Sequence, residues 1–140
     1  MSAKDWLNRG YRISKEIETK EAVLETMLKI VSKTETSGSQ ISRTQNTNEA
    51  SFIRWSELKN NIDRLKTELI SIDQETDDFL RQLPNPDEYR ILYCRYVRRM
   101  DWRDIRRTFP QLKEATMFRL HSRGIKHISE LTTHEFDRYI

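Results

Sequence analysis

The sequence predicts an all-α protein, with a long antiparallel helical hairpin that resembles a coiled coil and a smaller helical domain after it. Only three glycines and three prolines occur in 140 residues, which disfavours a β-protein rich in turns. Two long segments place apolar residues at alternating steps of three and four, which is the spacing of one helix face. A third, shorter segment carries the start and stop signals of several short helices.

The first long segment predicts a helix that ends near residue 32. Its apolar stripe is interrupted once, by Lys20, and consists of Trp6, Ile13, Ile17, Leu24, Met27 and Val31. The stretch from Ser32 to Asn48 that follows is rich in Ser, Thr, Asn and Gln, a composition typical of flexible connections. We therefore expect a loop over about residues 33–50.

The second long segment predicts a helix from near Ser51 to about Gln82. Its stripe lapses only at Thr76 and consists of Trp55, Leu58, Ile62, Leu65, Leu69, Ile72 and Phe79. Two helices of similar length joined by a loop predict an antiparallel hairpin with facing stripes, which we call the predicted arm, residues 1–83. Because two helices bury little core, the arm either closes on itself or is covered by a partner helix or a second copy.

Residues 84–140 predict a separate helical domain. Asn85 can cap a helix whose first position is Pro86. The next two residues, Asp87 and Glu88, are acidic and therefore favourable at the positive end of the helix dipole. We expect this helix to stop near Arg99, with its inward positions at Leu92, Tyr93, Tyr96 and Val97.

Two more helices are expected in this domain. Asp101 can cap a short helix from Trp102 to about Phe109, which Pro110 ends. A last long helix follows from about Leu112 to Leu131, and no structure is predicted for residues 132–140. The expected packing sets Trp102, Ile105 and Phe109 against Met117, Leu120 and Ile125.

Charge is spread unevenly along the chain. Residues 1–83 hold 13 Lys and Arg against 14 Asp and Glu, whereas residues 90–126 hold eleven against three, a net charge of +8. Such a concentration is typical of a surface that binds a polyanion. A helix, a short helix, a turn and a longer helix in one basic segment are the layout of a helix-turn-helix, which sets its second helix in the major groove of DNA.

This layout predicts two groups of DNA-binding residues. Side chains expected to point outward from the last helix would contact base edges; they are Lys113, Glu114, Thr116, Phe118, Arg119, Ser122, Arg123 and Lys126. Arginines on the preceding helices would contact phosphates and make the affinity dependent on salt; they are Arg98, Arg99, Arg103, Arg106 and Arg107.

From Tyr89 to Ile128 the sequence resembles the sigma-70 region-4-like domain, through YRILYCRYVRRMDWRDI and ATMFRLHSRGIKHI. More narrowly, it resembles the small late-transcription regulators of Gram-positive phages and prophages, the ArpU-, RinA- and Ltr-like superfamily. The family's W-x-x-I step falls on Trp102 and Ile105, and its recognition-helix signature falls on residues 116–123. The resemblance implies a sequence-specific double-stranded-DNA-binding activator of late genes.

The chain departs from this family at two positions. Arg106 stands where a small residue is usual, and Lys113 stands where a Ser or Thr cap is common. The turn at residues 109–112 also lacks glycine and has one extra residue. Which of residues 113–115 faces a base therefore stays open.

Other classes of function are less well supported. The sequence holds no GxSxG, HExxH or phosphate-binding loop, so we expect no catalysis and no cofactor. His121, His127 and His134 lack the i, i+4 spacing of a helical metal site, so no metal is expected. Cys94, the only cysteine, is expected to be a small buried residue.

Two alternative functions and the oligomeric state stay open. In the first alternative, the predicted arm is the main binding surface of a protein-interaction factor, for example an antagonist of a repressor. In the second alternative, the basic domain contacts RNA polymerase instead of DNA, as a polymerase accessory. A homodimer is a further alternative. No apolar run approaches the roughly 18 residues that span a bilayer, so an intracellular protein is expected. The resemblance implies that its place is the cytoplasm of a bacterial host.

Overall fold

The computed structural model describes the backbone of residues 1–36 and 41–131, and the side chains of residues 1–30 and 49–131. Regular structure within these ranges is helical throughout, which confirms the predicted all-α class. The chain divides into two compact units. Unit 1 combines Met1–Arg12 with the chain from Ile70 onward, and unit 2 is Ile13–Leu69.

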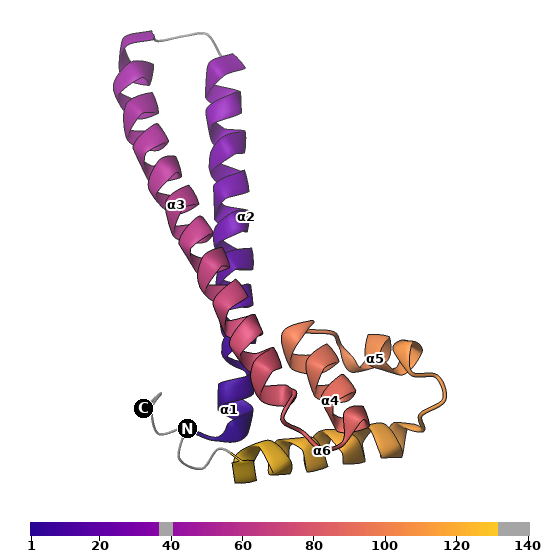
Figure 1. Cartoon of the computed structure of the whole chain (residues 1–140). Helices are drawn as coiled ribbons and strands as arrows, with labels where there is room; N and C mark the ends of the chain where they lie inside the picture. The colour runs from indigo at the N-terminus through magenta and orange to yellow at the C-terminus, as the bar shows by residue number, and fades with distance from the viewer. Residues whose placement is uncertain (37–40, 132–140) are drawn as a thin grey trace. The chain divides into compact units, whose positions relative to one another are not determined.

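The helices follow one another along the chain as shown in Figure 1. They are α1 (Ala3–Leu7), α2 (Arg9–Thr36), α3 (Ile41–Leu80), α4 (Pro86–Leu92), the π-helical segment η1 (Tyr93–Val97), α5 (Trp102–Thr108) and α6 (Glu114–Leu131). The long helices α2 and α3 belong partly to each unit.

The expected loop over about residues 33–50 is wrong in extent, because α2 reaches Thr36 and α3 begins at Ile41. Only residues 37–40 of that stretch lie outside the described helices. Ser, Thr, Asn and Gln are weaker helix formers than Ala, but each costs well under about 1 kcal/mol. Once a helix is nucleated, a run without proline can therefore continue it.

Unit 2 is built from α2 and α3, which run in opposite directions (Figure 1). Three side chains are buried between them, Ile17, Ile62 and Leu65. The flanking positions Ile13, Leu24, Leu58 and Leu69 pack against these three and are half-buried. The Lys66 ammonium lies 2.8 Å from the Glu21 carboxylate across the two helices. The apolar stripes predicted from the sequence supply this core.

Unit 1 contains the N-terminal helix α1, which the sequence assigned to the predicted arm. The Ser2 hydroxyl accepts a hydrogen bond from the Asp5 backbone N–H at 3.1 Å and caps α1, and the helix ends at Leu7, with Asn8 as its C-cap. Trp6 is fully buried in the first core of unit 1, which comprises Ala3, Trp6, Leu7, Leu80, Leu83, Leu92, Tyr96 and Ile128. The division between the units thus differs from the expected boundary at Leu83.

Helix α4 begins as predicted. The Asn85 side chain accepts a hydrogen bond from the Asp87 N–H at 2.9 Å, and Pro86 is the first helical residue. The chain continues through η1 and turns at Arg99, whose φ of 53° is unusual for a residue with a side chain. Two hydrogen bonds of 2.7 and 3.0 Å join the Arg99 guanidinium to Asp73, and so hold this turn against α3.

Helices α5 and α6 form a second core with the end of α4. The Asp101 carboxylate accepts a hydrogen bond from the Asp104 N–H at 2.8 Å, the predicted cap of α5. Ile91, Ile105, Met117 and Leu120 are buried there, and Trp102 and Phe109 pack at its edge. The expected contact of Ile125 with α5 is replaced by packing against the first core, and α6 begins at Glu114, two residues after the expected start.

Candidate nucleic-acid interface

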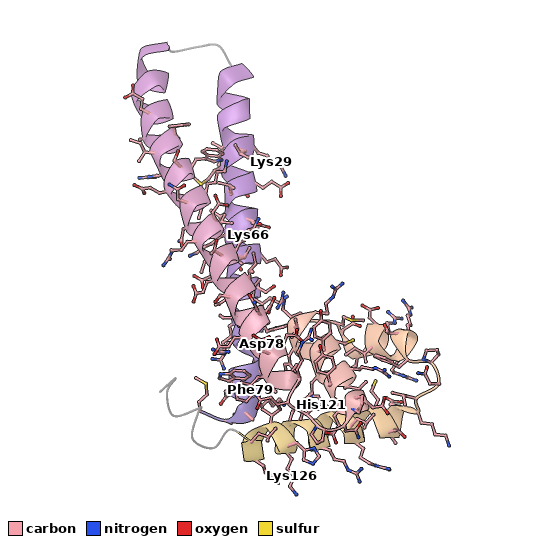
Figure 2. The ribbon with its side chains drawn as sticks, in the orientation of Figure 1. Lys29, Lys66, Asp78, Phe79, His121 and Lys126 are labelled. Atoms are coloured by element: carbon pink, nitrogen blue, oxygen red, sulfur yellow. The ribbon has the colours of Figure 1, made fainter. Side chains whose placement is uncertain are left out.

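Helix α6 has one buried and one exposed face. Met117, Leu120, Gly124 and Ile128 are buried and anchor the helix to the two cores of unit 1. At 100° per residue, the opposite face is centred on Ala115, Arg119, Ser122 and Lys126, and all four are exposed. Figure 2 shows Lys126 extending from α6 on the side away from α4.

The structure exposes seven of the eight residues expected to contact bases. Thr116 is half-buried; the exposed ones are Lys113, Glu114, Phe118, Arg119, Ser122, Arg123 and Lys126. Lys113 lies just before the first residue of α6. Ala115, which the sequence left undecided, is exposed at the centre of this face. The exposure of Ala115 could have been predicted from the sequence only if the first residue of α6 had been known.

Four of the five arginines expected to contact phosphates are exposed. Arg103, Arg106 and Arg107 lie on α5, and Arg98 follows η1. Arg99 differs, because its guanidinium is half-buried and its two hydrogen bonds to Asp73 already occupy it. A planar two-point contact with a carboxylate is the geometry in which an arginine is held most firmly. Arg99 therefore serves the fold of unit 1.

Most of the positive charge on this surface has no carboxylate partner. The Arg106 guanidinium lies 3.7 Å from the Glu114 carboxylate, and that of Arg107 lies 3.9 Å from Asp104. Exposed ion pairs of this kind contribute little to stability. Within the part of the chain that the structure describes, six cations around α5 and α6 make no ion pair: Arg98, Arg103, Lys113, Arg119, Arg123 and Lys126. Six unneutralised charges on one small unit attract a polyanion.

An aromatic cluster that the sequence did not predict lies beside this face. The Trp102 ring meets the rings of Phe118 and His121 edge to face, each with centroids 4.9 Å apart. The Arg95 guanidinium lies 5.0 Å from the Trp102 centroid and donates a hydrogen bond to the Met100 carbonyl at 2.9 Å. The cluster joins α5 to α6, and residues from three helical segments fix its geometry.

His121 is held in its neutral form. Its Nε2 lies 2.7 Å from the Tyr96 hydroxyl. Burial, with smaller contributions from the positive charges of Lys4 and Arg95, lowers the pKa of His121 to about 4. The ring is therefore uncharged at neutral pH and acts as a hydrogen-bonding and packing group.

A pair of interacting side chains, Glu88 and His127, joins α4 to α6. Glu88 is 1% exposed, and its carboxylate lies 2.7 Å from Nδ1 of His127. A carboxylate buried this deeply needs such a partner, since an unpaired one would pay a large desolvation cost. The sequence indicated Glu88 only as an acidic residue at a helix start, and nothing in its spacing pointed to His127.

The comparisons with known proteins give no relative for this chain. No family model, no curated protein and no solved structure matches it. In residues 1–36 and 41–131, none of the helices is both long enough and apolar enough to cross a membrane. The same residues bring together no group of three or more His, Cys, Asp or Glu side chains that could hold a metal ion.

Proposed function

We propose that this protein is a sequence-specific double-stranded-DNA-binding transcription regulator. In this proposal α5, the turn after it and α6 act as a sigma-70 region-4-like helix-turn-helix, and α6 enters the major groove. The observation that carries the proposal is that six cations around α5 and α6 make no ion pair with any residue that the structure describes. A role as a late-gene activator of a phage or prophage rests on the resemblance of residues 89–128.

The packing of α6 supports its role as the recognition helix. Both cores of unit 1 contact its buried face, so the exposed face is presented on a fixed scaffold. That face combines long cationic side chains with the small polar Ser122 and the apolar Phe118. Arginine pairs with guanine and apolar groups with thymine, so such a mixed face suits sequence recognition as well as phosphate attraction.

A mobility-shift titration tests the proposal. Fragments of the source genome, including the region beside the gene, would be titrated at two salt concentrations with excess nonspecific competitor. We expect Arg119→Ala and Arg123→Ala each to weaken the specific complex by about 1–3 kcal/mol. Arg54→Ala is the matched control, because Arg54 is an exposed arginine of unit 2. Complexes that vanish with competitor in the unsubstituted protein would contradict sequence-specific binding.

A second candidate function is protein binding through unit 2, with α2 and α3 acting as a helical hairpin. It is favoured by large apolar side chains on the surface of this unit, including Val23 at 48% exposed and Phe52 at 64%. Its partner would be a repressor, RNA polymerase or a second copy of this chain. In this case Leu65→Asp, which disrupts the core of unit 2, abolishes the biological activity while the affinity for DNA survives.

A further inference from the structure

Phe118 is a large apolar side chain on a face that is mostly polar and cationic. It is 38% exposed and lies three residues after Ala115 and four before Ser122, so the three are neighbours on the surface of α6. Arg119 follows it directly, and both Arg119 and Ala115 are exposed. Phe118 and Ala115 therefore form an apolar patch beside the cationic side chains.

Phe118 is also held in place, as a recognition group must be. Its ring contacts the Trp102 ring edge to face at 4.9 Å. The Trp102 ring is in turn held by its contacts with the His121 ring and with the Arg95 guanidinium. The second core is closed by Ile91, Ile105, Met117 and Leu120, so the exposed part of the Phe118 ring is not needed to complete it.

The geometry points to Phe118 as the residue that selects a thymine, through contact with the 5-methyl group of the base. This inference rests on the proposed DNA-binding function and specifies what one position of α6 reads. The methyl group of thymine is the apolar feature that base pairs present in the major groove. The other base edges present donors and acceptors there, which a phenyl ring would bury without a hydrogen bond.

Deoxyuridine substitution tests the contact, because deoxyuridine differs from thymidine only by this methyl group. Duplexes would first be selected from a random pool by the unsubstituted protein in the presence of competitor. Each thymidine of a selected duplex would then be replaced singly. We expect one replacement to weaken binding about three- to tenfold, the loss of one buried methyl contact. In Phe118→Ala the same replacement should change the affinity less than about twofold.

Two controls locate the effect. Ala115→Ser replaces the other exposed apolar group of this patch by a polar one and should keep the full sensitivity to deoxyuridine. Circular dichroism of Phe118→Ala shows whether α6 is retained, and the scan on the unsubstituted protein does not depend on that variant. A scan in which no replacement weakens the unsubstituted protein overturns the inference, as does undiminished sensitivity in Phe118→Ala. A random pool that yields no competitor-resistant duplex instead overturns the proposed function itself.

Discussion

At the scale of single residues, His121 should link stability to pH. The ordinary pKa of 6.5 is lowered to about 4 in the folded protein. Between these values the unfolded chain binds more protons, so the stability that neutral His121 provides is present above pH 6.5 and is lost as the pH falls toward 4. A shift of this size corresponds to about 3 kcal/mol, and the partial exposure of the ring reduces the expected loss to about 1–2 kcal/mol.

Urea unfolding of the unsubstituted protein and His121→Gln at pH 7 and pH 4.5 measures this linkage. The glutamine keeps a polar end near Tyr96 but does not titrate. The difference in unfolding free energy between the two proteins should therefore narrow by about 1–2 kcal/mol at the lower pH. Equal pH dependence in both proteins would show that His121 does not carry the effect.

For single residues, the sequence predicts exposure on a helix better than it predicts the partners in side-chain pairs. The exposure of Arg119, Arg123 and Lys126 follows from helical periodicity once α6 is recognised. The pairs Asp73–Arg99 and Glu88–His127 are separated by 26 and 39 residues in sequence. A charge pattern does not specify which acid and base meet over such distances, because tertiary packing decides it.

At the scale of elements, the crossing of α4 and α6 depends on Gly124. A Cβ added there would lie 2.7 Å from Cδ1 and 3.1 Å from Cγ of Leu92. Leu92 is fully buried, so its side chain cannot move aside without disturbing the core. Gly124→Ala should therefore destabilise unit 1, even though alanine favours a helix by about 1 kcal/mol over glycine.

A double-mutant cycle separates these opposing effects. Leu92→Ala removes the γ and δ carbons that meet the new methyl group. In that background Gly124→Ala should become neutral or stabilising by up to about 1 kcal/mol, because only the helix propensity remains. Thermal or urea unfolding of the four proteins gives the coupling energy. If Gly124→Ala has the same effect in both backgrounds, the contact with Leu92 does not limit the crossing.

Helix starts that carry a capping residue were predicted more accurately than the start of α3, for which no cap was predicted. The caps at Asn85 and Asp101 act through local hydrogen bonds, and both are present. The start of α3 was misplaced because a polar composition resembles a loop but does not prevent a helix. The π-helical segment η1 has no sequence signal of this kind, and the sequence predicted a continuous helix there.

At the scale of the whole molecule, the assignment of Trp6 had the largest consequence. Its place in the first apolar stripe suggested one helix, yet α1 ends at Leu7 and carries Trp6 into the first core of unit 1. Periodicity shows which face of a helix is apolar but not which core receives it. For this reason the sequence predicted a boundary at Leu83, whereas unit 1 combines both ends of the chain.

The two units have separate cores, so disrupting one should leave the other folded. Leu65→Asp places a carboxylate among Ile17 and Ile62 in unit 2, which costs several kcal/mol. Trp55 is the tryptophan of unit 2, and Trp6 and Trp102 belong to unit 1. In NMR spectra we expect the indole N–H resonance of Trp55 to shift to an unfolded position while those of Trp6 and Trp102 persist.

The conservative variant Leu65→Met is the control and should leave all three resonances in place, since it nearly conserves volume. The same Leu65→Asp protein then separates the two candidate functions. If unit 1 persists and still binds the selected duplex, unit 1 is sufficient for recognition of DNA, and any lost biological activity belongs to unit 2. Loss of all three resonances together would instead show that the chain unfolds as one cooperative structure, with the thin core of unit 2 supporting the DNA-binding surface.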